Sequence, residues 1–492
     1  MTWQDVAAQR KASILDAIPA EWRLKTAHTG DSAMSAFKDS GILTAEELAI
    51  TETSAADLVH SLAIGKLTAV AVTTAFLKRA ALAHQLVNCL LGFMPEYALA
   101  RAKSLDEYFA KHKKPSGPLH GLPISLKDQC RVKGFDTSMG YVGWIGMKDD
   151  ESSVLVDLLD KAGAVFYVKT SVPQSLMVCE TINNITGRTV NPRNKNWSCG
   201  GSSGGEGALI GCYGSPIGIA TDIGGSIRVP AAFNFLYGIR PSHGRLPYAK
   251  LANSMEGQET IHSVVGPICH SIADMRVFMK AVLGEKPWQF DSKTIPMPWR
   301  PEEEDAIRSK ISSGGLTLGV YSCDGNDIFG SLKLSGEPAI PNIQELVNPD
   351  LKKVGVNDVW DLQLSKWNYQ IEYLAKIREF EAKTGRELDA IIAPITPTAA
   401  VRHNQFKYYG YATVINVLDW TSVVVPVTFA DKALDAKATD FKPLSDIDAT
   451  VQAEYDPEAY HGAPVAVQII GRRLTEERIM AIAEEVGRLL KN

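Results

Sequence analysis

The segment from residue 200 to residue 230 combines glycines and serines in a way that could support chemistry. It reads GGSSGGEGALIGCYGSPIGIATDIGGSIRVP, with glycine pairs on both sides of Ser202 and directly before Ser226. One interpretation is a phosphate-binding loop. A Walker loop, however, ends in Lys followed by Ser or Thr, whereas Glu206 follows the glycine pair here. Because this carboxylate would repel a pyrophosphate, nucleotide binding is the weaker interpretation.

The second interpretation is covalent catalysis by Ser226. Gly224 and Gly225 precede it without side chains, so their backbone N–H groups can approach a reacting carbonyl closely. The Ser226 hydroxyl could attack that carbonyl while amides of the same loop hold the developing oxyanion, and such donors contribute about 2.7–4 kcal/mol each. The alternative is a structural turn before Arg228 and Pro230, and the loop alone leaves the two readings even.

A serine nucleophile requires a base at neutral pH. None of the ten histidines lies in a G-x-S-x-G or an H-E-x-x-H context. Lys127 ends the apolar run LPISLKD, where its aliphatic stem would be buried. Burial could lower its pKa from ~10.4 toward the ~7–8 that suits a general base. A single lysine at a strand end is more often a solvated charge, so Lys127 is a candidate only in combination with the serines.

The three elements together resemble the amidase signature family. Lys127 in GLPISLKD, Ser202 and Ser203 in GGSSGGE, and Ser226 in TDIGGSIRVP fit its pattern, with 75 residues from Lys127 to Ser202 and 24 from Ser202 to Ser226. The N-terminal stretch and the segments PRNKNWSCGG, AAFNFLYGIRPSHGRLPYAK, DAIIAPITPTAAVRH and AYHGAPVAVQIIGRR are similar to those of fungal acetamidases, a branch of the general amidases. The resemblance covers nearly the whole chain.

The resemblance implies a Ser–Ser–Lys triad that needs no cofactor and no metal. Ser226 would be the acylated nucleophile, and Ser202, which a cis peptide holds in the family, would relay the proton. Lys127 would enter neutral as the base and then protonate the leaving amine. The resemblance also implies that the oxyanion hole and substrate-binding loop comprise Ile223, Gly224, Gly225, Ser226 and Ser202.

Three residues beside the triad are expected to support its shape. Asp222 and Arg228 flank the nucleophile loop, and both types suit bidentate pairing. A buried structural pair is favoured over the alternative, in which Arg228 binds a substrate carboxylate. Ser203 is assigned the same supporting role.

The acyl pocket is less well defined by the sequence. Leu176 and Met177, with Tyr141, are the candidates for lining it, although such residues are more often plain core. Cys130 and Cys179 lie near the motifs without neighbours that would activate a thiolate, so they are interpreted as packing residues.

The elements that position these residues divide near residue 117. Residues 1–117 read as a helical N-terminal extension and first helices, with a break at Gly65. From residue 118, strands such as VFYVKT, DAIIAP and PVAVQIIG alternate with helices. The predicted fold class is α/β: a large twisted, mostly parallel or mixed central sheet covered by helices on both faces, with residues 118–492 as one amidase-signature domain.

Composition narrows the partners and the location. The 492 residues carry 51 Lys and Arg against 56 Asp and Glu, and without a basic run no nucleic-acid partner is expected. No apolar run approaches the ~20 residues that span a bilayer, and the first residues do not resemble a signal peptide. Seven scattered cysteines without a C-x-x-C pair indicate reduced thiols, so the expected location is cytoplasmic and no membrane partner is expected.

Compared with acetamidase-like proteins, the chain is expected to lack a piece of the fold near residues 325–335. Only NDIFGSLKL separates Gly325 from Ser335, which is too short for a helix–strand unit of roughly 30 residues. A loop omitted from the numbering, a mis-joined reading frame and a natural deletion are all open explanations. A protein of this literal sequence is expected to be unstable or aggregated unless another chain covers the exposed face.

The leading functional hypothesis is hydrolysis of a small, acetamide-like carboxamide to the acid and ammonia through an acyl-serine. The expected partner is the small-molecule amide, and a homodimer is a candidate assembly. Three alternatives stay open: an amidase for larger, aryl or fatty acyl amides, a transamidase subunit acting on charged tRNA, and a catalytically impaired paralogue.

Overall fold

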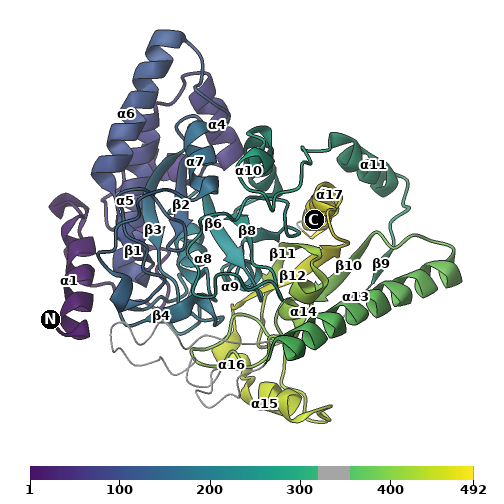
Figure 1. Ribbon diagram of the computed structural model, residues 1–492. Helices are drawn as coiled ribbons and strands as arrows, with labels where there is room; N and C mark the ends of the chain where they lie inside the picture. Colours follow the sequence, from purple (N-terminus) through teal and green to yellow (C-terminus); the bar gives the residue numbers. More distant parts are fainter. Residues whose placement is uncertain (320–354, 491–492) are drawn as a thin grey trace.

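The central sheet has ten strands in the part of the chain that the computed structural model describes, residues 1–319 and 355–490 (Figure 1). The expected gap near residues 325–335 lies outside these residues. In spatial order the strands are β1 (Leu90–Phe93), β3 (Val165–Thr170), β2 (Pro123–Lys127), β6 (Ile217–Asp222), β8 (Val264–Cys269), β7 (Tyr237–Arg240), β11 (Thr421–Phe429), β12 (Pro464–Gly471), β10 (Ala390–Pro394) and β9 (Leu318–Gly319). A separate small sheet pairs β4 (Ile182–Asn183) with β5 (Gly187–Arg188).

The sheet is mixed. Within the described strands, β2 pairs in parallel with β3 and β6, and β10 pairs in parallel with β9. The remaining neighbours are antiparallel. The α/β class is therefore confirmed, and of the two expected arrangements, mostly parallel or mixed, the sheet has the mixed one. β2, which ends at Lys127, is buried along its whole length, as expected for a parallel strand covered on both faces.

Helices cover both faces of this sheet. On β7, Gly238 lies against Ala231 of α9 (Arg228–Phe233), while the neighbouring Tyr237 reaches Gly487 of α17 (Glu476–Leu489). Because successive strand residues point to opposite faces, α9 and α17 lie on opposite sides of the sheet. The helix α8 (Gly204–Gly211) packs beside α9, and α10 (Ile272–Gly284) packs beside α17.

The remaining helices surround this core. They are α1 (Trp3–Asp16), α2 (Ala36–Asp39), α3 (Ala45–Glu52), α4 (Ala55–Ala63), α5 (Ala69–Val87), α6 (Pro95–His112), α7 (Val154–Lys161), α11 (Pro301–Ser312), α13 (Val356–Thr384), α14 (Gly410–Leu418), α15 (Asp446–Glu454) and α16 (Pro457–Tyr460). Short 3-10 turns are η1 (Ala20–Trp22), η2 (Val142–Trp144), η3 (Gln174–Leu176) and η4 (Pro287–Gln289). Among the described helices, none is both long and apolar enough to cross a membrane.

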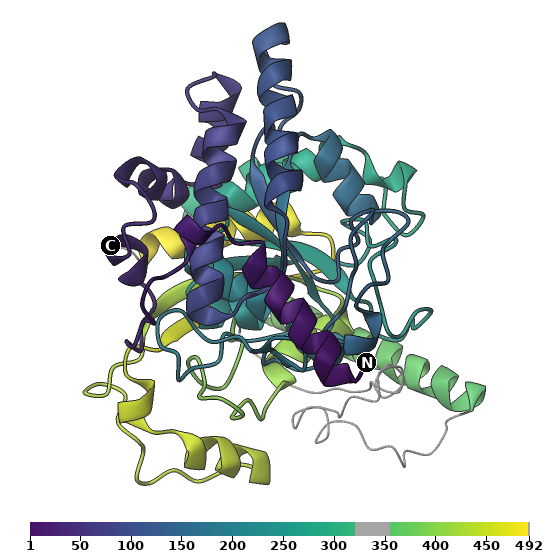
Figure 2. The ribbon, with the colours of Figure 1, turned by 90° about the vertical axis from the view of Figure 1, so that its left-hand side faces the viewer.

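The N-terminal region is mostly helical, with one difference from the sequence prediction. α4 and α5 are separated at Gly65, as predicted, and α1 lies across the side of the molecule that Figure 2 turns toward the viewer. The run LLGF, however, forms β1, which pairs with β3 at one edge of the sheet. Residues 1–117 therefore contribute a strand to the α/β core, and an exclusively helical reading of them is wrong.

The long helix α13 carries an apolar stripe on its solvent side. It lies beside α14 at the periphery of the molecule (Figure 1), with Lys366 Nζ donating to the Thr260 carbonyl and Gln370 Nε2 to the Val417 carbonyl. The large apolar side chains that recur at intervals of three or four residues are exposed instead. This apolar stripe consists of Trp360, Leu364, Trp367, Ile371 and Leu374.

Candidate active site

Lys127 is fully buried at the end of β2. Its Nζ lies 2.8 Å from Ser202 Oγ and 2.8 Å from Thr221 Oγ1. Burial lowers the pKa of Lys127 to about 7, although the nearby carboxylates of Asp222 and Glu206 oppose the shift. A substantial fraction of the side chain is therefore a neutral amine near pH 7, which is the form that can accept a proton.

The loop that precedes α8 positions the two adjacent serines. The Gly201–Ser202 peptide bond is cis, and Ser202 Oγ faces Lys127. The next residue joins this loop to the nucleophile loop, since the N–H of Ser203 donates to the Ser226 carbonyl at 3.2 Å. The Ser203 hydroxyl also accepts from the N–H of Thr221 at 3.4 Å. These contacts are what a supporting role for Ser203 requires.

The loop that carries Ser226 is shaped by the carboxylate of Asp222. The N–H groups of Gly225 and Ile227 donate to its two oxygens at 2.8 and 3.1 Å. Gly225 has a φ of 119°, a conformation that favours glycine. Because the N–H of Gly225 already donates to Asp222, it is not free to stabilise an oxyanion. No hydrogen bond among the described residues uses the N–H groups of Ile223, Gly224 or Ser226.

A buried ion pair holds this carboxylate. Arg228 donates from Nε and Nη2 to the two oxygens of Asp222, each at 3.0 Å, and neither side chain is exposed. Burial alone would raise the pKa of Asp222, but Arg228 and the amide of Asn416 hold it well below its usual value. Arg228 also donates to Asn416 and Gln468, so each of its three nitrogens has an acceptor within the protein. The arrangement matches the structural role, and the alternative of a carboxylate-binding Arg228 is not supported.

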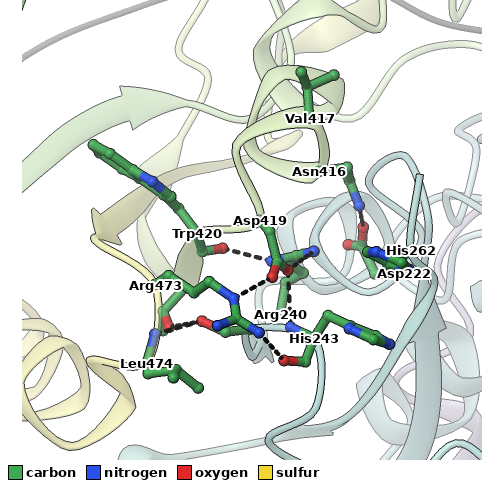
Figure 3. A network of polar contacts seen from close by, with 12 residues as sticks. Asp222, Arg240, His243, His262, Asn416, Val417, Asp419, Trp420, Arg473 and Leu474 are labelled. Atoms are coloured by element: carbon green, nitrogen blue, oxygen red, sulfur yellow. Dashed lines mark hydrogen bonds and ion pairs between the residues drawn. The ribbon is translucent and has the colours of Figure 1, made fainter. Parts of the chain in front are cut away.

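This pair connects to a second polar cluster at the end of α14. Figure 3 shows the amide of Asn416 directed at Asp222, while Asp419, just past the C-terminal end of the same helix, faces two arginines. Arg240 Nη2 donates to Asp419 at 2.9 Å, and Arg473 Nε donates to it at 2.6 Å. The contacts of Asn416 and Asp419 thereby hold α14, from the C-terminal half of the chain, against the nucleophile loop and Arg240.

A small cavity opens over the serines. Its volume is about 30 Å³. It is lined by Gln129, Met139, Ser175, Leu176, Met177, Ser202, Thr221, Ile223, Ser226, Tyr248, Asn253, Ser254, Met255 and Ser263. Leu176 and Met177 therefore lie where the sequence placed them, whereas Tyr141 is buried against Trp144 and does not line the cavity.

Glu206 is buried on the side of the sheet that carries Lys127. It accepts from Ser125 Oγ at 2.5 Å and from Thr170 Oγ1 at 2.9 Å. Burial raises its pKa to about 8, against the opposing effect of these hydrogen bonds and of Lys127. A Cβ on Gly218 would lie 1.9 Å from its carboxylate, so glycine is required there for close approach. Glu206 therefore belongs to the core beneath the site and not to a phosphate loop.

The remaining candidate groups near the site are inert. Burial raises the pKa of Cys130 to about 12 and also raises that of Cys179, so both thiols stay protonated and serve as packing. No histidine lines the cavity. Within residues 1–319 and 355–490, no group of three or more His, Cys, Asp or Glu side chains is arranged to hold a metal ion.

Sequence reasoning missed several residues of the site. Thr221 and Gln129 lie next to recognised motif positions, TD and LKDQ, and that proximity was the available signal. Asn416 and Gln468 lie 188 and 240 residues from Arg228, their partner at the site. Tyr248 and Gln468 fall within the segments AAFNFLYGIRPSHGRLPYAK and AYHGAPVAVQIIGRR, whose resemblance to acetamidases was the available signal. Nothing in the sequence around Asn416 indicates its place.

Three comparisons place the chain among known proteins. The family model described as Amidase matches residues 71–333 and 331–480. An acetamidase of Emericella nidulans is 62% identical, covering 100% of this chain and 99% of its own, and an acetamidase of Aspergillus oryzae is 58% identical, covering 99% of each. The solved structure of a fatty acid amide hydrolase superposes with a TM-score of 0.89 at 31% identity, covering 100% of this chain and 95% of that one.

The mixed sheet, its helical layers and these likenesses define the class as hydrolases that act on carbon–nitrogen bonds of small-molecule amides. The chain belongs to the amidase family, with the signature motifs and fold of its amidase-signature members.

Proposed function

We propose that the protein hydrolyses a small carboxamide, such as acetamide, to the carboxylic acid and ammonia through an acyl-serine intermediate. The observation that carries the proposal is the 2.8 Å contact between Lys127 Nζ and Ser202 Oγ, beside a cavity that Ser202 shares with Ser226. A buried amine with a pKa of about 7 is a suitable ultimate base, and a bridging hydroxyl extends its reach to the nucleophile.

In the acylation half, Ser226 Oγ attacks the amide carbon while its proton passes to Ser202 Oγ, whose own proton passes to neutral Lys127. The resulting oxyanion is held by free N–H groups of the nucleophile loop, those of Ile223, Gly224 and Ser226. The proton then returns through Ser202 to the amide nitrogen, the C–N bond breaks, and ammonia leaves. The product of this half is an ester of Ser226.

In the deacylation half, water replaces the amine. It gives up a proton through Ser202 to Lys127 as its oxygen attacks the ester carbon. The same N–H groups hold the second oxyanion, and the proton returns to Ser226 Oγ as the acyl–oxygen bond breaks. The carboxylic acid leaves and the triad is restored, so no cofactor enters the balance.

The proposed preference for short acyl chains rests on the cavity and on the relatives. The cavity over Ser202 and Ser226 is small, about 30 Å³, which favours a short acyl group over a long chain. Two relatives at 58–62% identity are named acetamidases. We expect acetamide and propionamide to be turned over faster than benzamide or oleoyl amide under equal conditions. Faster turnover of oleoyl amide would replace the proposal with a fatty-acyl amidase.

The nucleophile assignment is tested by covalent labelling. An acyl-phosphonate or fluorophosphonate probe should label Ser226, and Ser226→Ala should lose both labelling and hydrolysis while keeping the parent melting temperature. Ser309→Ala, which removes an exposed hydroxyl on α11, is the control and should behave as the parent. Unchanged labelling of the Ser226→Ala protein would refute the assignment, and a parent protein without labelling or turnover would indicate an impaired paralogue.

Two further parts of the proposal concern assembly and location. The apolar stripe of α13 supports a homodimer, because such surfaces are commonly covered in assemblies. The six cysteines of the described residues are free and buried, which supports a reducing, cytoplasmic location. Light scattering of the purified protein and localisation of a tagged chain test these two parts.

A further inference from the structure

A chain of hydrogen bonds runs from Lys127 to the wall of the cavity. Lys127 Nζ contacts Thr221 Oγ1, and Thr221 Oγ1 lies 2.7 Å from Gln129 Oε1. On its other side, Gln129 Nε2 lies 2.7 Å from the Ala252 carbonyl and 2.9 Å from Tyr248 Oη. Gln129 and Thr221 are each only 3% exposed, so water does not compete strongly for these contacts.

The direction of each bond in this chain follows from the Ala252 carbonyl. A backbone carbonyl only accepts, so the nitrogen end of the Gln129 amide must face it. The oxygen end therefore faces Thr221, and because an amide oxygen also only accepts, the single hydroxyl proton of Thr221 must point to Gln129. Toward Lys127, Thr221 is left with lone pairs alone.

The direction of the Thr221 hydroxyl determines whether the lone pair of neutral Lys127 can accept a proton. A neutral amine has two N–H groups and one lone pair. One N–H is donated to Thr221, so the lone pair stays available to the proton of Ser202. Without Gln129, the hydroxyl of Thr221 could rotate and donate into that lone pair, and the base would be occupied.

We propose that Gln129 is a positioning residue that holds Thr221 as an acceptor and thereby keeps the lone pair of Lys127 free for Ser202. The inference rests on the proposed Ser–Ser–Lys mechanism. Gln129 also connects the base to the cavity lining, because it donates to the Ala252 carbonyl and to Tyr248 Oη. Tyr248 Oη in turn donates to Ser263 Oγ at 2.9 Å.

The first experiment replaces Gln129 by Met, which fills similar space without a polar amide. We expect kcat for acetamide to fall about 10–100-fold, part of the 10²–10⁴-fold that general-base catalysis supplies, with KM within about 3-fold of the parent. A hydroxyl that donates to the neutral amine stabilises the uncharged form. The acid limb of the kcat/KM profile should therefore move to lower pH while the plateau falls, which a merely structural defect would not produce.

The decisive experiment is a double-mutant cycle with Thr221→Val, which removes the hydroxyl that could rotate. In the Thr221→Val background, Gln129→Met should cost less than about 3-fold in kcat, because no competing donor remains. Thr221→Ser keeps the hydroxyl and should stay near the parent. An equal cost of Gln129→Met in both backgrounds, or a parent-like Gln129→Met enzyme, would overturn the inference.

Two controls separate the possible failures. Gln85→Met removes a matched set of three hydrogen bonds, to Trp22, Leu24 and Ala81, far from Lys127, and should lower stability without moving the pH profile. Lys127→Ala tests the mechanism itself. Full activity of Lys127→Ala refutes the triad and this inference together, whereas an inactive Lys127→Ala beside a parent-like Gln129→Met refutes the inference alone.

Discussion

Two buried side chains beneath the cavity, Lys127 and Glu206, have pKa values that burial shifts in opposite directions. Burial lowers the pKa of Lys127 to about 7 and raises that of Glu206 to about 8, so a substantial fraction of each group is neutral near pH 7. Among the described residues, neither has a full counter-charge within hydrogen-bonding distance: hydroxyls contact both side chains. In the proposed mechanism the base is therefore the uncharged form of Lys127, in a core that avoids isolated charges.

The pH profile of hydrolysis should reflect the lysine. General-base catalysis requires the neutral amine, so kcat/KM should rise with pH through a midpoint near 7 and level off above it. Measurement between pH 5 and pH 9 in buffers of constant ionic strength checks this expectation. A rate that stays level down to pH 5 would contradict a lysine base, and full inactivation by an imidazole reagent with Lys127→Ala still active would indicate a histidine.

The stability of the fold should reflect Glu206. Its pKa in the folded protein, about 8, is raised above the ordinary value of 4.5 for a glutamate side chain. The folded state therefore binds more protons between these values, and the contribution of Glu206 to the free energy of unfolding is full below pH 4.5 and is lost as pH rises through 8. Relative to Glu206→Gln, which keeps a neutral hydrogen-bonding group, the parent should lose stability from pH 5 to pH 8 in urea titrations. Parallel pH curves for the two proteins would contradict the shift.

At this scale the sequence motifs predicted which residues lie together at the candidate site, but not the residues that orient them. Lys127, Ser202 and Ser226 are recognisable because glycines and serines surround them in a rare pattern. For Gln129 the only sequence signal is its place directly after the motif LKD, and the role proposed for it depends on the carbonyl of Ala252, which the local sequence does not indicate. Asn416 reaches Asp222 only through tertiary packing, which local residue types do not encode.

Among the elements, strands flanked by strong turn signals were predicted and short ones were not. PVAVQIIG and VFYVKT are β-rich runs that the structure assigns to β12 and β3. β1 contains only the four residues LLGF between two helices, and it forms a strand because it pairs with β3. Short apolar runs are ambiguous between helix and strand without that partner.

The helix α13 leads to a prediction about surface behaviour. Trp360 and Trp367 are 63% and 60% exposed in its apolar stripe, and contiguous exposed apolar surface binds hydrophobic dyes and promotes association. The double variant Trp360→Gln/Trp367→Gln should bind less anilinonaphthalene sulfonate and associate less, with kcat unchanged. Lys376→Gln on the same helix is the control. Equal dye binding by the double variant and the parent would contradict an exposed stripe.

For the whole molecule, the absence of a family segment near residues 325–335 stays a prediction, and it lies outside the described residues. Two findings support it. The family model matches in two segments that meet at residues 331–333. The alignment with the Emericella nidulans acetamidase spans 541 positions against 492 residues of this chain, a difference of 49.

Restoring that segment is the corresponding test. A chain that carries the relative's intervening residues at 331–333 should melt at a higher temperature and aggregate less than the 492-residue protein, because the insert would cover apolar surface. The melting curve and the elution profile of both proteins measure this. A 492-residue protein that is already monodisperse, melts cooperatively and is fully active would overturn the prediction.

The contacts of Arg228 predict that activity is lost before the whole fold unfolds. Its guanidinium takes two partners from the C-terminal third of the chain, Asn416 in α14 and Gln468 in β12, although none of the proposed catalytic residues lies in that third. A local unfolding event that separates β12 and α14 from the rest of the sheet would remove two hydrogen-bond acceptors of the buried Arg228 side chain. The loop that holds Ser226 would then lose its support. Turnover should therefore cease in mild denaturant while slowly exchanging amides of β2, β3 and β6 still resist hydrogen exchange. The rate of hydrolysis would therefore report whether Arg228 is still in contact with β12 and α14.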